Sequence, residues 1–152
     1  MIYVVDASVA IDWFARQKGS PDAAFLSERT IKRIAPDLVF SEVTNVIQRK
    51  TRQGELTLMQ AEKALAILGN AFDEILPSQD LYRQAFDLSR KLDHSVYDCI
   101  YLAATLSIDD SFLVTSDMKF LAKANAAGEG ERIHTLEMAH RLFVSAQENK
   151  HG

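Results

Sequence analysis

Cysteine is almost absent from this chain: Cys99 is the only one in 152 residues, so no disulfide bond can form within it. The sequence also lacks the Cys and His spacings of zinc sites, and no apolar run approaches the roughly 20 residues of a membrane helix. The first apolar stretch meets Asp6 too early, and without a preceding basic segment, to be a signal peptide. These absences predict a cytoplasmic protein with no membrane association.

Proline and glycine are also sparse, and no linker, repeat or low-complexity segment divides the chain. We therefore expect one domain spanning residues 1–152, which is long enough to bury a stable core. The net charge of −4, from 17 basic and 21 acidic residues, is unfavourable for a protein that binds nucleic acid. If four carboxylates hold metal ions, however, the other 17 acidic residues are balanced by the 17 basic ones, which leaves room for a basic patch.

Short apolar segments alternate with longer amphipathic ones along the chain. The short segments predict strands at residues 2–5, 33–36, 74–77, 111–115 and 132–134. The longer ones predict helices at residues 9–15, 21–31, 37–52, 57–72, 78–92, 95–106, 117–124 and 136–146, with Asp37 and Thr57 as N-caps. This alternation is typical of an α/β fold in which helices cover both faces of a central, mainly parallel sheet.

Two acidic residues come at or shortly after the ends of predicted buried strands. Asp6 ends the first strand, and Asp117 follows the strand at residues 111–115. Open α/β sheets bind their ligands at the carboxyl ends of the strands, so both side chains are candidates for a site. Each could instead serve the helix that follows it, Asp6 as an N-cap and Asp117 by complementing the helix dipole.

Two further acidic residues lie in apolar surroundings. Glu42 is on or beside the buried stripe of the helix at residues 37–52, and Asp98 is the only charged residue between positions 96 and 104. A buried carboxylate without a partner is costly, and the sequence indicates no lysine or arginine on the same faces. A cation shared by the four acids would supply the missing charge. Alternatively, Glu42 faces solvent, and Asp98 forms a capping box with Ser95.

Four converging carboxylates would offer only oxygen ligands, which favours Mg²⁺ or Mn²⁺ over zinc or copper. Such ions lower the pKa of bound water, orient its attack and stabilise a leaving oxygen, as phosphodiester hydrolysis requires. Polar residues near the acids could orient water or a carboxylate, or could be ordinary caps and surface groups: Ser8, Asn45, Thr115 and Ser116. The histidines show no ligand spacing, so we assign no catalytic role to His94, His134, His140 or His151.

The four acids lie in segments that resemble the motifs of the PIN domain family, and most closely those of VapC-type ribonuclease toxins from bacterial toxin–antitoxin pairs. In chain order these segments are Val-Val-Asp-Ala-Ser at 4–8, Ser-Glu-Val-Thr-Asn-Val at 41–46, Tyr-Asp-Cys-Ile-Tyr-Leu-Ala at 97–103 and Leu-Val-Thr-Ser-Asp-Met-Lys-Phe-Leu at 113–121. Their order and spacing agree with the family from residue 2 to about residue 135. One motif alone would be weak, but four in order are fairly specific.

The resemblance implies a three-layer α/β/α PIN fold and a metal-dependent endoribonuclease that cleaves RNA. By this interpretation Asp6 and Asp98 are the principal ligands of Mg²⁺ or Mn²⁺, and Glu42 and Asp117 complete the catalytic site. It also implies a homodimer and a protein antitoxin whose tail crosses the acidic groove, with higher toxin–antitoxin assemblies possible.

The sequence departs from the family pattern in two places. Cys99 stands where alanine is more common, which we expect to be a packing variation. Met118 and Lys119 stand where some members carry a further acid, so either one or two metals could bind. Two alternatives are a PIN-like protein that binds RNA or a partner without cutting, and a phospho-accepting receiver domain. The second is disfavoured because Asp6 has no acidic neighbour and Asp117 takes the place of the receiver's lysine.

Overall fold

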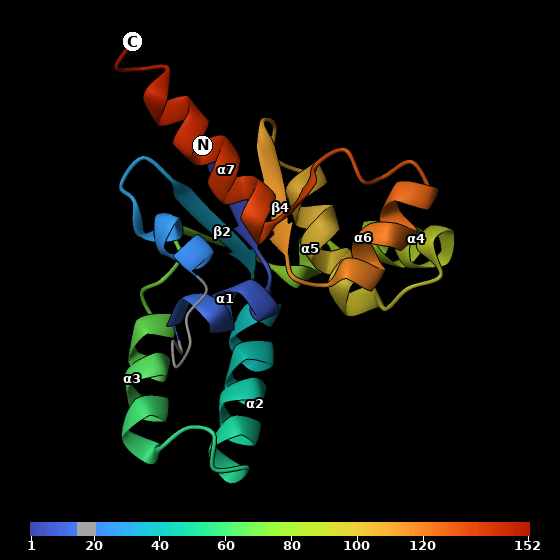
Figure 1. Ribbon diagram of the computed structural model, residues 1–152. Helices are drawn as coiled ribbons and strands as arrows, with labels where there is room; N and C mark the ends of the chain where they lie inside the picture. The colour runs from blue at the N-terminus through green and yellow to red at the C-terminus, as the bar shows by residue number, and fades with distance from the viewer. Residues whose placement is uncertain (15–20) are drawn as a thin grey trace.

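The computed structural model describes residues 1–14 and 21–152, which form a central five-stranded sheet covered by helices (Figure 1). The strands are β1 (Ile2–Val5), β2 (Lys32–Pro36), β3 (Glu74–Leu76), β4 (Ser111–Thr115) and β5 (Ile133–Thr135). All of them pair in parallel, in the order β3-β2-β1-β4-β5. The predicted α/β/α architecture with a parallel sheet is confirmed.

The central strands β1 and β4 are apolar on both faces. Tyr3, Val4 and Val5 of β1, and Leu113 and Val114 of β4, are each at most 1% exposed. Aromatic and β-branched side chains suit strands that are covered on both sides. Val5 pairs with Val114 across the ladder, so β1 and β4 end side by side.

Helices lie on both faces of the sheet (Figure 1). On one face are α1 (Ala7–Phe14), the 3₁₀ helix η1 (Pro21–Ser27) and α7 (Leu136–Glu148). On the other are α4 (Tyr82–Leu92), α5 (Val96–Leu106) and α6 (Met118–Ala126), of which α5 packs against β1, β2 and β4. None of the described helices is long and apolar enough to cross a membrane.

The helices α2 (Leu38–Arg52) and α3 (Leu58–Leu68) form an antiparallel pair that projects from the sheet (Figure 1). Gly54, at φ +76°, allows the chain to turn between them. The predicted N-cap Thr57 is confirmed: its hydroxyl accepts from the Gln60 N–H at 3.1 Å, and the Gln60 side chain accepts from the Thr57 N–H at 2.8 Å. The pair therefore has well-defined ends.

Asp37 is not the side-chain N-cap that the sequence predicts for α2. Its carboxylate instead accepts hydrogen bonds from the backbone N–H of Ser78, at 3.1 Å, and from the Ser78 hydroxyl. This contact holds the 3₁₀ helix η2 (Ser78–Asp80) near the start of α2. The predicted helix at 78–92 is therefore two elements, η2 and α4.

Other predicted helix boundaries also differ from the structure. The helix expected at 21–31 is a 3₁₀ helix that ends at Ser27, whose hydroxyl accepts from Trp13 Nε1 at 2.8 Å. The helix expected at 57–72 ends at Leu68, because the chain turns at Gly69 and Phe72 packs against Trp13. The helix expected at 9–15 begins earlier, at Ala7, and Ala15 lies outside the described residues.

Arg132 joins the last turn of α5 to the start of β4. Its guanidinium donates to the carbonyls of Thr105 at 2.7 Å and Ser111 at 3.0 Å, to the Ser111 hydroxyl at 2.9 Å and to the Ile108 carbonyl. The last carbonyls of a helix have no partner within the helix. Arg132 satisfies one of them and so fixes α5 relative to β4.

Candidate active site

The chain changes direction across the sheet between β1 and β4. The connection from β1 leads to β2 on one side, whereas the connection from β4 leads to β5 on the other. In parallel sheets such a switch point opens a crevice at the carboxyl ends of the strands. The backbone N–H of Asp6 donates to the Val114 carbonyl at 3.3 Å, and Asp117 follows the end of β4. Asp6 and Asp117 therefore lie at the same edge of the sheet.

Asp6 is the most buried of the four acids, with 8% of its surface exposed. Its Oδ1 accepts hydrogen bonds from the Ser8 hydroxyl at 2.7 Å and from the Val9 N–H at 3.0 Å. Burial raises the pKa of Asp6 to about 6, although the side chains of Thr115 and Ser8 and the Val9 N–H lower it. Asp6 is thus an N-cap of α1 as well as one of the four candidate acids, Asp6, Glu42, Asp98 and Asp117, which we call the acidic cluster.

Asp117, at the start of α6, likewise caps a helix and faces the site. Its Oδ1 accepts from the Phe120 N–H at 3.0 Å, as an N-cap does, and its own N–H donates to Thr115 Oγ1 at 3.0 Å. Its Oδ2 lies 3.9 Å from Nε2 of His94. Capping one helix therefore leaves the second carboxylate oxygen available to the site.

Glu42 and Asp98 reach the same place from α2 and α5. Burial raises the pKa of Glu42, whose Oε1 is buried without a hydrogen-bond partner, and the charge of Asp98 raises it further. The capping box considered as an alternative role for Asp98 is not formed: the Ser95 hydroxyl accepts from the Tyr97 N–H at 3.2 Å, and Asp98 Oδ2 contacts His94 Nε2 at 2.6 Å. Neither acid is a simple surface residue.

All four acids line one pocket of about 320 Å³. Ser8 and Asn45 line it as well. Thr115 is buried beneath it, where it interacts with Asp6 and accepts from the Asp117 N–H. Ser116 is exposed and donates its backbone N–H to Ser8 Oγ at 3.3 Å. The structure therefore brings the four predicted acids together, with three of the predicted supporting side chains in contact with them or beside them.

Tyr101 lines the pocket and has no part in the sequence-based prediction. It is 1% exposed, and its hydroxyl lies beside Glu42 without a hydrogen bond of normal geometry. Burial, together with the negative charges of Glu42, Asp6 and Asp98, raises the pKa of Tyr101 far above its usual range. Its position one helical turn after Asp98 puts it on the same face of α5, which is the signal that could have identified it.

Two basic residues, Arg49 and His94, also reach the site. Arg49 lines the pocket from α2, two helical turns after Glu42, although no basic residue was expected on that face. His94, to which no role was assigned, contacts Asp98 four residues later. The His94–Asp98 spacing spans the N-cap of α5, so it is not visible as a ligand pattern within one helix.

The acidic cluster has the properties of a cation site. Within residues 1–14 and 21–152, none of the four acids forms an ion pair with lysine or arginine, and His94 is the only partner of this kind for Asp98 and Asp117. The unpartnered Oε1 of Glu42 and the raised pKa of Asp6 both indicate missing positive charge. Carboxylate oxygens in this number fit Mg²⁺ or Mn²⁺.

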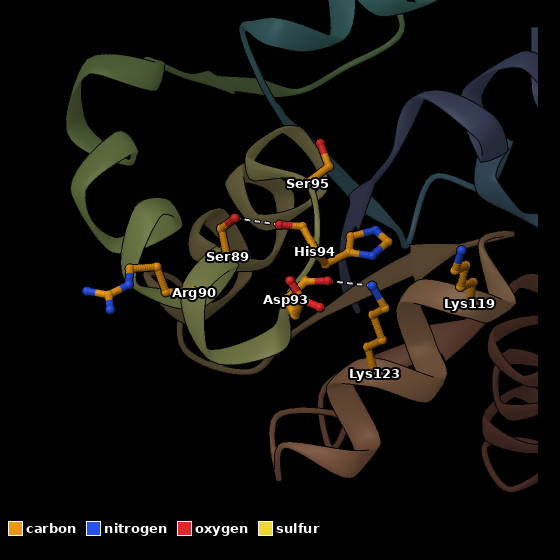
Figure 2. A pocket seen from close by; sticks show the side chains of 7 residues that line it. All are labelled: Ser89, Arg90, Asp93, His94, Ser95, Lys119 and Lys123. Carbon is orange, nitrogen blue, oxygen red and sulfur yellow. Dashed lines mark hydrogen bonds between the residues drawn. The ribbon is translucent and has the colours of Figure 1, made fainter.

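A second pocket, of about 480 Å³, adjoins His94 (Figure 2). Its lining is mainly basic and polar: Ser89, Arg90, Asp93, His94, Ser95, Lys119 and Lys123. Lys119 and Lys123 extend from α6, and Lys123 donates to the Asp93 carbonyl. Arg90 and Lys119 form no ion pair with any described residue. His94 therefore connects an acidic pocket with a basic one.

Comparisons with known proteins agree with this architecture. The chain is similar in structure to PAE2754 from Pyrobaculum aerophilum, with 22% identity, a TM-score of 0.68, and coverage of 95% of this chain and 90% of that chain. It is also similar to VapBC-1 from nontypeable Haemophilus influenzae, with 14% identity, a TM-score of 0.58 and coverage of 90% and 99%. A third similar structure is VapBC2 from Rickettsia felis, solved bound to a DNA fragment from its promoter. It has 13% identity, a TM-score of 0.59, and coverage of 89% of this chain and 98% of that chain.

At these identities the structural likenesses show a common fold and no more. A comparison with curated protein sequences gave no match. The model of the PIN domain family matches residues 3–126, a range that contains all four acids of the pocket. By this match over most of its length, the chain belongs to the PIN domain family.

Proposed function

We propose that this protein is a metal-dependent endoribonuclease that hydrolyses RNA phosphodiester bonds. The observation that carries the proposal is that Asp6, Glu42, Asp98 and Asp117 line one pocket although they belong to separate segments. Collecting these carboxylates does not stabilise the fold, because desolvation and mutual repulsion raise the pKa of Asp6 and Glu42. Perturbed carboxylates in a cleft are typical of functional sites, and here they favour Mg²⁺ or Mn²⁺.

The side chains around the acids would prepare them for an ion. The Ser8 hydroxyl and the Val9 N–H hold Asp6, so this proposed principal ligand is oriented in advance, and His94 Nε2 lies 2.6 Å from the other one, Asp98. Bound Mg²⁺ or Mn²⁺ would supply the charge that promotes attack of water on the phosphate and stabilises the leaving oxygen. Because an ion binds the carboxylate and not the acid, the pKa of about 6 for Asp6 predicts weaker binding below pH 6.

Basic side chains flank the acidic pocket and support RNA as the substrate. Arg49 lies in the pocket itself, and Lys119 and Lys123 lie in the adjoining pocket, beyond His94 (Figure 2). Phosphates on either side of the cleaved bond would contact these cations, which position a strand without reading its sequence. The overall charge of −4 is thus compatible with a polyanionic substrate.

We further propose that the protein is the toxin of a toxin–antitoxin pair that acts in the cytoplasm as a homodimer. The PIN family match and the two VapBC structures among its structural neighbours support this role. A cognate antitoxin would cover the acidic pocket and stop cleavage, and larger toxin–antitoxin assemblies could follow. A short reading frame beside this gene that encodes a small DNA-binding protein would identify the candidate antitoxin, and its co-purification and inhibition of cleavage would test it.

Cleavage of RNA by matched variants tests the enzyme proposal. Total RNA is incubated with wild-type protein, Asp6→Asn or Asp98→Asn, with Mg²⁺, Mn²⁺ or EDTA, and the new 5′ ends are sequenced. We expect defined ends from the wild type with metal, and none from either variant or with EDTA. The control is Asp87→Asn, an exposed position on α4, which should cleave normally. Undiminished cleavage by the Asp6 and Asp98 variants, with circular dichroism showing intact folds, would refute the proposal.

A protein that binds RNA without cutting it is the second candidate, since the basic pocket would be sufficient for that role. It predicts RNA binding that EDTA does not change, and no cleavage products with any divalent metal. The four acids argue against it, because a binding-only protein has no use for carboxylates that repel RNA.

A further inference from the structure

His94 is held firmly between the two pockets. It lies in the turn between α4 and α5, directly after Asp93, whose backbone is left-handed at φ 50°. The Ser89 hydroxyl donates to the His94 carbonyl, and Lys123 from α6 donates to the Asp93 carbonyl (Figure 2). Side chains from two helices therefore fix the backbone that carries this imidazole.

The imidazole ring itself is also fixed. It packs against Phe120 with 4.9 Å between the ring centroids, and only 10% of the His94 side chain is exposed. Its Nε2 lies 2.6 Å from Asp98 Oδ2 and 3.9 Å from Asp117 Oδ2. One ring nitrogen thus faces two of the four acids.

These three residues offer donor atoms that one ion could share. The nitrogen of His94 and one oxygen each from Asp98 and Asp117 all lie within 4.8 Å of one another. Metal–ligand bonds of about 2.1–2.2 Å place the donors of one ion roughly 3–4 Å apart. A shared ion would therefore replace the 2.6 Å hydrogen-bond contact between His94 Nε2 and Asp98 Oδ2 and move these two atoms slightly apart. Imidazole nitrogen suits transition-metal ions such as Fe²⁺ and Zn²⁺, and Mn²⁺, the weakest binder of that series, still tolerates it better than Mg²⁺, which prefers oxygen.

We propose that His94 is a metal ligand, and that with Asp98 and Asp117 it forms a mixed nitrogen and oxygen site that selects Mn²⁺-like ions over Mg²⁺. The inference rests on the proposed function, since it concerns the ions of the same acidic cluster. It changes the expectation drawn from four carboxylates alone, which give no preference between Mg²⁺ and Mn²⁺. If His94 instead acts only as a hydrogen-bonded partner of Asp98, its nitrogen does not touch the ion.

Pulsed electron paramagnetic resonance of the Mn²⁺-loaded protein distinguishes these possibilities, because it detects nitrogen bonded to the ion. We expect ¹⁴N modulation from the wild type, replacement of this signal by ¹⁵N coupling after ¹⁵N-histidine labelling, and its loss in His94→Gln. We also expect Mn²⁺ affinity to fall by more than the roughly 10- to 100-fold that follows loss of a hydrogen-bonded partner of a ligand, with a smaller change for Mg²⁺. His151→Gln, at an exposed position, is the matched control and should behave as the wild type.

Absence of nitrogen coupling in the wild type, or its persistence in His94→Gln, would overturn the proposal. The isotope-labelled wild type gives a decision even if the variant does not fold. RNA cleavage measured on the same samples separates this result from the nuclease proposal. Cleavage without nitrogen coupling would refute only the proposal that His94 is a metal ligand. Nitrogen coupling without RNA cleavage would refute only the proposal that the protein is a nuclease.

Discussion

Asp6→Asn should make the metal-free protein more stable. Asp6 is 8% exposed and has a pKa of about 6 in place of its ordinary 3.8, a difference that corresponds to about 3 kcal/mol at pH 7.5. Asparagine carries no charge and keeps an oxygen that can accept from Ser8 and Val9, so the cap of α1 is retained. Because charge-assisted hydrogen bonds are lost and the new amide needs an acceptor, we expect a net gain of about 1–2 kcal/mol.

The pH dependence of this gain has a definite sign. The pKa of Asp6 is higher in the folded state than in the unfolded chain, so the folded state binds the extra proton between about pH 4 and pH 6. The stability that this group contributes is complete below about pH 4 and is lost as the pH rises through 6. The Asn variant lacks this loss, so the two stability curves should separate between pH 4 and pH 6.

Urea unfolding in EDTA at a series of pH values measures the effect, and a gain of 1 kcal/mol corresponds to about 2–4 °C in Tm for a chain of this size. Adding Mn²⁺ should reverse the order, because an ion at 100 times its Kd stabilises the wild type by about 2.7 kcal/mol and binds the variant poorly. The exposed Asp87→Asn should change stability by less than about 0.5 kcal/mol. An Asp6→Asn variant less stable than the wild type at pH 7.5 without metal would refute the reasoning.

Three further outcomes are expected. Replacing Lys119 and Lys123 by glutamine should weaken RNA binding and reduce the slope of log affinity against log salt by about 0.7 for each lost phosphate contact, and an unchanged slope in anisotropy titrations would exclude them as contacts. Tyr101→Phe should leave the stability unchanged or raise it by about 1 kcal/mol, because the hydroxyl is buried beside Glu42 without a hydrogen bond of normal geometry, and clear destabilisation in urea would contradict this. Cys99 should resist iodoacetamide at pH 7.5, since burial raises its pKa to about 11, and rapid labelling seen by mass spectrometry would contradict that environment.

Most of the fold follows from local patterns in the sequence. The apolar runs that form β1 and β4 are buried on both faces, and such runs separated by amphipathic helices leave few arrangements other than a parallel sheet. Asp6 and Asp117 could be identified because each follows a buried strand, and the carboxyl ends of parallel strands meet at one edge. Glu42 and Asp98 could be identified as charges in apolar surroundings.

Two contacts that join separate elements could not be identified in this way. Asp37 has the sequence position of an N-cap, but its carboxylate accepts a hydrogen bond from Ser78, which lies beyond α2, α3 and β3 in the chain. His94 precedes the helix that carries Asp98, so its nitrogen reaches the acids only through the fixed turn and the packing of Phe120. The Asp37–Ser78 contact leaves no periodic signal because it joins separate elements, and the four-residue spacing of His94 and Asp98 crosses the start of α5, so it is not recognisable as a pair on one helix.

Arg132 fixes the position of Asp98 from the opposite end of α5. Asp98 is in the first turn of α5 and Thr105 in its last, about 10 Å further along the axis, where the guanidinium holds it. A shift of α5 along its axis would break the hydrogen bonds of Arg132. Lysine would not restore them, because its compact ammonium lacks the planar set of donors of a guanidinium. A random screen for inactive variants should therefore recover changes at Arg132, and such hits would report how little displacement the distant carboxylate tolerates.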